Sequence, residues 1–200
     1  MTGQSYPAAI ALALGTAACG GPFFESDTDA SSADPPPMAP DREQESVPQV
    51  GDAPEGNQDN TGARLEERVI ELVNQRRSEG STCGGELMPP VPSLSEDSRL
   101  SAAARAHSED MAARNYFSHR SPEGEEPADR ANSAGYGGGF GGENIAAGPF
   151  TAEDVMVLWM QSPGHCRNIM RPRFEEIGVG YGRSSNARYG HYWTQKFGSR

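Results

Sequence analysis

The N-terminal part of the folded region repeats apolar residues at helical spacing. Over residues 64–80 the apolar positions fall on one helical face, Glu and Arg residues lie opposite, and Gly80 is a suitable stop. The apolar positions are Leu65, Val69, Leu72 and Val73. The pattern predicts a first helix that ends near Gly80.

Residues 94–117 carry a second stripe of the same period. Its members are Leu100, Ala103, Ala104, His107 and Met111, and Ser95 is the candidate N-cap. A third helix is predicted from Thr151, which stands in capping-box spacing with Asp154. Its inward residues would be Val155, Leu158 and Trp159.

The run SPGHCRNIM at residues 162–170 predicts a fourth, shorter helix. Ser162 would cap it, and Pro163 would take the first helical position, where a missing N–H costs nothing. Residues 121–148 are glycine-rich and read as a long surface loop.

The pattern changes period near the C-terminus. The segments IGVGYG (177–182) and HYWTQKFG (191–198) are β-branched or aromatic and flank a polar loop, which predicts an antiparallel hairpin. Helices around a small antiparallel sheet indicate an α+β fold, arranged as an αβα sandwich.

The first 19 residues read as an export signal. Residues 6–18 form an apolar run too short to span a bilayer, and small residues lead to Cys19. The sequence TAACGG is similar to a bacterial lipoprotein box, although Thr16 replaces the usual leucine and residues 1–5 hold no Lys or Arg. We expect Cys19 to be lipidated and to anchor the chain to a membrane; the alternative is an ordinary cleaved signal with an incidental cysteine.

Composition separates a linker from the folded domain. Residues 20–62 are rich in Pro and Ser and carry ten acidic side chains against Arg42 alone, which predicts a disordered tether. Most of the formal net charge of −11 therefore belongs to this linker. Residues 63–200 are close to neutral and lack a basic stripe, so nucleic acid is excluded as a partner.

Cysteine usage predicts one disulfide. If Cys19 is lipidated, Cys83 and Cys166 are left, an even number in an exported chain. We expect them to pair, at a gain of roughly 4.5 kcal/mol on the chain-entropy model. Two free buried thiols are the alternative.

Histidine is the residue type whose titration and ligand chemistry best suit a site here. His107 lies on an apolar helical stripe and is expected to be a core residue, and His191 opens a strand and is expected at its edge. His119 follows the second helix and can face a cleft. Glu143 stands in an apolar, Gly-rich stretch, where its pKa could be raised for acid–base work or the group could clasp backbone donors. His165 would be held in place by the adjacent disulfide in either role.

Five ordered motifs resemble one family. They are HSEDMAARNYFSHRSPEG, GENIAAG, WMQSPGHCRNIM, FEEIGVGYG and YWTQKFG, over roughly residues 65–198. They are similar to the CAP superfamily of cysteine-rich secretory, antigen 5 and pathogenesis-related proteins, and most of all to its bacterial SCP-like branch. The resemblance implies a CAP-type αβα sandwich with a central antiparallel sheet and an open cleft.

In eukaryotic members that cleft holds two histidines and two glutamates, and the histidines can bind zinc. His119 matches the first histidine and Glu143 the first glutamate. Tyr192 stands where the second histidine would be, and the second glutamate is missing from WMQSPG. The resemblance to bacterial members makes His165 the substitute ring. His119 and His165 are then candidate ligands for Zn²⁺ or another divalent cation, with Glu143 and water.

Two functions follow for an exported protein of the cell envelope. The first is a binding module whose cleft takes a lipid, glycan or peptide. The resemblance supports it, since many family members act through binding and several bind sterols or lipids. The second is a metal-assisted hydrolase or peptidase with Glu143 as general base and His119 and His165 positioning metal or substrate. No spare cysteine and no serine in a GxSxG setting offers a nucleophile, which favours binding.

Overall fold

The computed structural model describes residues 58–200. The predicted signal, Cys19 and the linker up to residue 57 lie outside the described residues. The first helix, α1, spans Gln58–Glu79 and so begins ahead of the predicted domain boundary at residue 63. It ends where Gly80 adopts a positive φ of 77°.

The sheet has four strands in the order β3-β5-β6-β4. They are β3 (Ser95–Glu96), β4 (Gly139–Ala147), β5 (Glu176–Arg183) and β6 (His191–Ser199). The β5–β6 and β4–β6 pairs are antiparallel, as the sequence predicted for the sheet, and the short β3 runs parallel to β5. The C-terminal hairpin is therefore the centre of the sheet.

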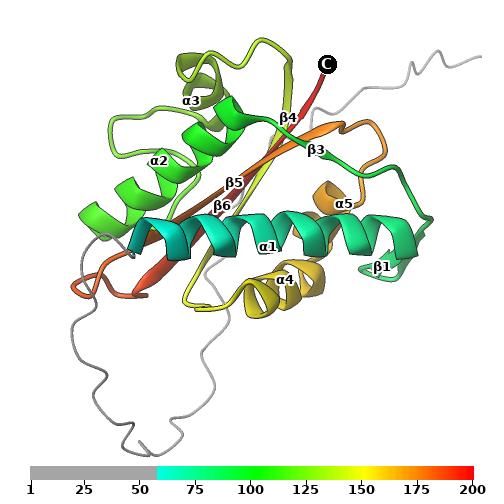
Figure 1. Cartoon of the computed structure of the whole chain (residues 1–200), viewed down its shortest axis with the longest axis horizontal. Helices are drawn as coiled ribbons and strands as arrows, with labels where there is room; N and C mark the ends of the chain where they lie inside the picture. Colours follow the sequence, from blue (N-terminus) through cyan, green and yellow to red (C-terminus); the bar gives the residue numbers. More distant parts are fainter. Residues whose placement is uncertain (1–57) are drawn as a thin grey trace, which may run out of the picture. The chain divides into compact units, whose positions relative to one another are not determined.

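Helices cover both faces of this sheet, which gives the predicted α+β, αβα arrangement (Figure 1). The helices α2 and α3 lie on one side, and α1, α4 and α5 lie on the other. The bounds of the later helices are Ser98–Arg114 (α2), Pro127–Ser133 (α3), Ala152–Gln161 (α4) and Pro163–Ile169 (α5). The predicted third and fourth helices correspond to α4 and α5.

Three glycines in β5 let α2 lie directly on the strand. Gly178, Gly180 and Gly182 alternate along β5 and face the helix, and a Cβ at Gly180 would come within 2.2 Å of the backbone of Ala104. Contacts that short do not occur between real atoms. The IGVGYG motif therefore encodes the close approach of α2 to β5, and His119 lies in the loop that follows this helix.

The larger hydrophobic core lies on the opposite face, between the sheet and α1, α4 and α5. Val69 and Val73 of α1, Trp159 of α4 and Trp193 of β6 are fully buried there. The indole of Trp159 also donates to the Ile145 carbonyl at 3.2 Å. The sequence predicted Leu158 of α4 to face inward, and this prediction is wrong, because Leu158 is exposed. Met156 of the same helix is buried instead.

The start of α2 differs from the sequence prediction. Ser95 was the expected N-cap, but Ser95 and Glu96 form β3 beside β5. The cap is Asp97, whose carboxylate accepts hydrogen bonds from the backbone N–H groups of Arg99 and Leu100. Thr151 caps α4 as predicted, and Pro163 occupies the first turn of α5.

The glycine-rich stretch 121–148 is not one long loop. It contains α3 and the whole of the nine-residue strand β4. Pairing with β6 satisfies the β4 backbone in spite of its glycines, and a register irregularity between Phe140 and Gly142 adjusts the strand before Glu143. Glu143 therefore projects from a sheet rather than from a flexible loop.

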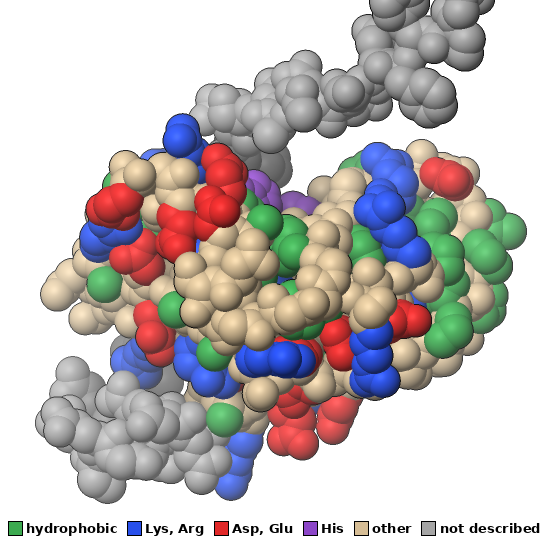
Figure 2. Space-filling view, turned by 90° about the horizontal axis from the view of Figure 1, so that it is seen from above, with side chains coloured by type: hydrophobic (Ala, Val, Ile, Leu, Met, Phe, Trp, Pro, Cys, Tyr) green, Lys and Arg blue, Asp and Glu red, His purple; other side chains and the backbone are tan. Residues whose placement is uncertain are grey.

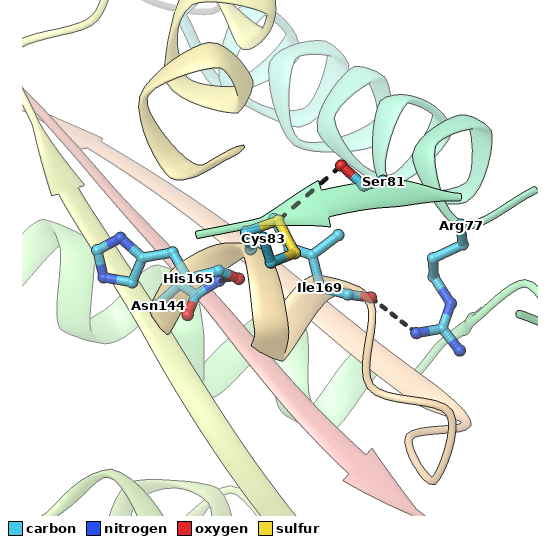
Figure 3. The surroundings of a disulfide bond; sticks show 7 residues. Arg77, Ser81, Cys83, Asn144, His165 and Ile169 are labelled. Carbon is cyan, nitrogen blue, oxygen red and sulfur yellow. Dashed lines mark hydrogen bonds between the residues drawn. A yellow bond between two sulfur atoms is a disulfide. The ribbon is translucent and has the colours of Figure 1, made fainter. Parts of the chain in front are cut away.

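The predicted disulfide joins Cys83 to Cys166, and both residues are fully buried. Cys83 ends β1 (Ser81–Cys83), which pairs with β2 (Glu86–Met88) across a Gly-Gly turn, so the bond ties this hairpin to α5 (Figure 3). Nearby, the buried guanidinium of Arg77 donates to four backbone carbonyls, those of Pro92, Ile169, Arg171 and Phe174. The segment that carries His165 is thus held from two sides.

Candidate functional site

Glu143 is positioned by the pairing of β4 with β6. Its register partner is Lys196, so both side chains leave neighbouring strands on the same face of the sheet, under α2 and α3. The side chain of Glu143 is 2% exposed and that of Lys196 is 0% exposed. Two opposite charges are therefore buried side by side, and burial of this kind requires pairing.

Three charged or titratable side chains contact the Glu143 carboxylate. Lys196 Nζ lies 2.5 Å from Oε2, and Arg130 Nη2 lies 3.2 Å from the same oxygen. His119 Nδ1 lies 2.9 Å from Oε1. Arg130 Nη2 also donates to the His119 carbonyl at 2.6 Å, and Lys196 Nζ donates to the Pro127 carbonyl. We call His119, Arg130, Glu143 and Lys196 the Glu143 cluster.

The electrostatics of the cluster keep Glu143 ionised. Burial alone would raise the pKa of its carboxyl, but the hydrogen bond from His119 and the charges of Lys196 and Arg130 outweigh burial and lower the pKa to about 2. Burial lowers the pKa of the Lys196 ammonium, and the adjacent carboxylate works against that change. Neither sequence-based reading of Glu143 describes this geometry, because the pKa is lowered rather than raised and the donors are the side chains of Lys196, Arg130 and His119 rather than backbone N–H groups.

The bond to Glu143 fixes the tautomer of His119. An ionised carboxylate can only accept, so Nδ1 carries the proton and, in the neutral ring, Nε2 keeps its lone pair. The His119 side chain is 46% exposed. The cluster thus presents the free edge of an oriented imidazole to solvent while its charges stay buried.

His165 lies near this cluster without joining it. It belongs to α5, whose backbone is tied to β4 by a hydrogen bond from the Asn144 amide to the His165 carbonyl at 3.2 Å. Its ring points away from the disulfide (Figure 3). Burial and then the electrostatic influence of His119 lower its pKa. His119 is therefore close enough to affect the titration of His165, but no hydrogen bond joins His165 to the cluster. The buried Nδ1 of His165 has no hydrogen-bond partner among residues 58–200.

The other candidate residues, Tyr192, His107 and His191, lie outside the Glu143 cluster and pack or hydrogen-bond within the fold. Tyr192 is fully buried with Met111 and Ile145, and its hydroxyl finds no partner within the described part of the chain. His107 is a core residue as predicted, and its Nε2 donates to the Ser118 carbonyl at 3.0 Å. His191 begins β6, where its Nδ1 shares a hydrogen bond with the Tyr181 hydroxyl. The structure thus brings together His119 and Glu143 but not Tyr192.

The donor set does not fit a divalent cation. Within residues 58–200 no three His, Cys, Asp or Glu side chains lie close enough together to hold a metal ion. One Glu143 oxygen already faces Lys196 and Arg130, and the other faces His119. An open zinc site needs three protein ligands. The predicted zinc ligands His119 and His165 therefore have no available third partner.

Two members of the cluster, Lys196 and Arg130, were not foreseen from the sequence. Lys196 had a signal, because it shares the strand face of Thr194 in a segment whose other residues read as buried. Arg130 had none, since α3 was read as part of a loop. In the structure it is a buried residue of α3 that also donates to the Glu125 carbonyl.

A pocket of about 820 Å³ lies beside the cluster, between α2, the segment 121–125 and α3. Alanines form much of its wall, Asp110, Arg114 and Glu123 are charged groups in its lining, and Arg130 connects it to Glu143. His119, Glu143, His165 and Tyr192 do not line it. This pocket thus shares only Arg130 with the Glu143 cluster.

Histidine surface is visible in a depression of the face that Figure 2 displays, next to a group of acidic and basic side chains. The rest of this face mixes charged and apolar side chains, as expected for a near-neutral domain. No helix in residues 58–200 combines the length and apolar character that a membrane crossing requires.

The fold and the motifs define the class of protein. The model of the cysteine-rich secretory protein (CAP) family matches residues 70–197, and the chain belongs to this family. Two curated relatives come from Bacillus subtilis. The chain is 43% identical over 132 residues to the protein YkwD, covering 66% of this chain and 46% of that one. It is 28% identical to the membrane protein YlbC over 132 residues, again 66% of this chain but 34% of YlbC.

The chain therefore spans less than half the length of these relatives. Among solved structures, an extracellular SCP-domain protein of Bacillus anthracis is similar with a TM-score of 0.63 and 28% identity. That match covers 76% of this chain and 45% of the other. An outer surface protein of Borrelia burgdorferi shares the fold, with a TM-score of 0.53, 17% identity and coverage of 72% and 95%.

Proposed function

We propose that this protein is an exported CAP-domain binding module of the bacterial cell envelope. Its ligand would be a lipid or peptide with an apolar segment, which is part of the lipid, glycan or peptide range expected from the sequence. The observation that carries the proposal is the pocket between α2 and α3. Its volume of about 820 Å³ lies in the range of small-molecule sites.

The chemistry of the pocket supports an amphipathic ligand. Ala102, Ala103 and Ala106 leave one side of the pocket without long side chains, so an apolar group can lie against α2. Charged side chains at Asp110 and Arg114 can meet a polar end. A bare glycan suits this wall less well, because methyl groups offer its hydroxyls no hydrogen-bond partners.

The Glu143 cluster supports binding over metal-assisted hydrolysis. A general base must reach a proton on substrate or water, but the Glu143 carboxylate is buried and both of its oxygens are engaged. Its lowered pKa also makes it a weak base. The cluster instead braces the wall of the pocket, since Arg130 belongs to both.

The oriented ring of His119 favours a second candidate, metal-free hydrolysis of envelope peptides. Here His119 Nε2 would be the general base, and Glu143 would orient the ring. Its test is a peptide library digested by the wild-type chain and by His119→Ala. Cleavage that disappears in the variant supports hydrolysis, and no cleavage by the wild type rejects it.

The binding proposal is tested by filling the pocket. Native mass spectrometry of the whole chain, after exposure to envelope lipid extract and to a peptide library, identifies the retained molecule for titration. Ala106→Trp should weaken its binding at least tenfold, because the indole would occupy the space beside α2. Ala113→Trp is the matched control, since Ala113 is exposed on the same helix outside the pocket. If no molecule is retained, or if both variants bind as the wild type does, the proposal is wrong.

Export and anchoring are part of the same proposal. The disulfide suits an oxidising compartment, and the Bacillus anthracis neighbour is described as extracellular. Anchoring rests on Cys19 as a lipidation site. Replacing Cys19 with Ala should release the protein from membranes into the soluble extracellular or periplasmic fraction; retention of the variant would contradict lipidation.

A further inference from the structure

The buried ammonium of Lys196 is the cation that the protein itself places at Glu143. It is the closest positive group to the carboxylate, at 2.5 Å from Oε2, and it is fully enclosed by protein. Its second bond, to the Pro127 carbonyl at 3.1 Å, ties it to the start of α3. The position of Nζ is therefore set by two acceptors on different elements.

The remaining lone pairs of Glu143 are directed to other protein donors. Arg130 Nη2 is shared between the two oxygens at 3.3 and 3.2 Å, and His119 Nδ1 takes Oε1. A divalent ion that approached Glu143 would meet two fixed positive charges from Lys196 and Arg130. It would have to displace both cations, and both side chains are buried.

We propose that Lys196 is a resident cation that makes this CAP site independent of divalent metal. Glu143 is the carboxylate that could complete a zinc site with His119, and Lys196 already pairs with it. The same contact keeps Glu143 charged and so keeps the His119 ring oriented without a metal. The inference goes beyond ligand binding, because it concerns what the cluster excludes.

The experiment is a zinc titration of the whole chain by calorimetry. Cys19 and the linker carboxylates can bind zinc themselves, so each protein is compared with its own His119→Ala derivative, in which that background is the same. For the wild type, His119→Ala should change zinc affinity by less than about twofold. Lys196→Arg is the matched control, because it keeps the positive charge, and it should behave in the same way.

Lys196→Met removes the charge and keeps an unbranched side chain. It should bind zinc at least tenfold more tightly than the wild type, and adding His119→Ala should remove the gain. Circular dichroism and disulfide mapping establish that this variant is folded. A folded Lys196→Met with no gain in zinc affinity overturns the proposal.

The wild type decides the question if Lys196→Met does not fold. Long-range ¹H–¹⁵N NMR spectra report the tautomer of His119, and they should show Nδ1 protonated with or without zinc. Zinc that shifts the His119 ring nitrogens, together with a tenfold loss of affinity in His119→Ala, would show that the site takes the metal in spite of Lys196, and the proposal would fall.

Discussion

Removing the charge of Glu143 should be one of the most destabilising single changes in this domain. Glu143→Gln keeps the shape of the side chain but leaves Lys196 and Arg130 buried without a carboxylate. Lys196→Met should cost less, because Arg130 and His119 still satisfy Glu143. The expected order of the two variants follows from which charge is left without a partner.

The size of the effect can be worked from the geometry. At 2.5 Å the Coulomb attraction between Nζ and Oε2 is roughly 6.6 kcal/mol at an effective dielectric constant of about 20, and desolvation cancels much of it. Breaking a buried pair by removing one partner costs about 3–5 kcal/mol. We expect a loss in this range for Glu143→Gln and about 1–3 kcal/mol for Lys196→Met. The double variant should lose less than the sum, by about 2 kcal/mol.

The assay is urea unfolding at pH 7 of the wild type, both single variants and the double variant, followed by tryptophan fluorescence. Trp159 and Trp193 are fully buried and report on the core. Lys196→Arg is included as the variant that keeps the charge. If Glu143→Gln loses less than about 1 kcal/mol, or if the two single losses simply add, then the buried pair does not contribute as the geometry requires.

Four further predictions concern the pH dependence set by His107 and by Glu143, the disulfide, and Arg77. Burial lowers the pKa of His107 from 6.5 to about 4, so between these pH values the unfolded chain binds a proton that the folded chain does not. Stability should therefore fall as pH drops from about 6.5 to 4. In a series of urea unfolding midpoints measured against pH, His107→Gln should flatten this part of the curve. Glu143 acts in a lower window, since its stabilisation is complete above about pH 4.5 and is lost as pH falls towards 2, and a loss that is unchanged in Glu143→Gln would contradict this. Cys83→Ser should cost about 2–5 kcal/mol and leave the buried Cys166 thiol to react with a probe only on unfolding, which thiol labelling across a urea series measures. Arg77→Lys should cost at least about 2 kcal/mol of stability, because one ammonium has three donors for four separate carbonyls. A melting temperature equal to that of the wild type would show that these four hydrogen bonds do not stabilise the fold.

Elements with a strong period or a clear cap were predictable from the sequence. The stripe of α1, the Thr151 cap of α4 and the hairpin of β5 and β6 each carry a local signal that the tertiary structure keeps. The failures share a physical cause. Ser95 is a good N-cap residue, but pairing with β5 draws Ser95 and Glu96 into a strand, and Asp97 takes the cap.

Glycine content misled the reading of residues 121–148 for a related reason. Glycine weakens a strand through entropy and lost packing, but β4 lies at the edge of the sheet, where β6 supplies its hydrogen bonds. The β1–β2 hairpin was also missed, although Gly84 and Gly85, both with positive φ, are a two-residue turn signal. Its strands of three residues each are too short to show alternation.

The site was predictable only where the chain supplies histidine and carboxylate in a recognisable motif. His119 and Glu143 were named from FSH and GENIA, and they meet at 2.9 Å. What the pair does could not be read from those motifs, because it depends on which cations lie beside the carboxylate. Arg130 reaches Glu143 from α3. The sequence does not predict this helix or its direction, so it could not predict where the Arg130 guanidinium lies.

Lys196 shows where strand period could have changed the interpretation. Residues alternate across a strand, so Tyr192, Thr194 and Lys196 share one face of β6, and Lys196 falls opposite Glu143 in the register with β4. A lysine enclosed on that face needs an anion, and Glu143 is the carboxylate that the register offers. Had β4 been recognised as a strand, the pair would have followed, and with it the expectation of an ionised Glu143 instead of a base with a raised pKa. The position of β4 thus discriminates between the binding and hydrolase hypotheses, because it determines whether the Glu143 carboxylate faces solvent or the buried Lys196 ammonium.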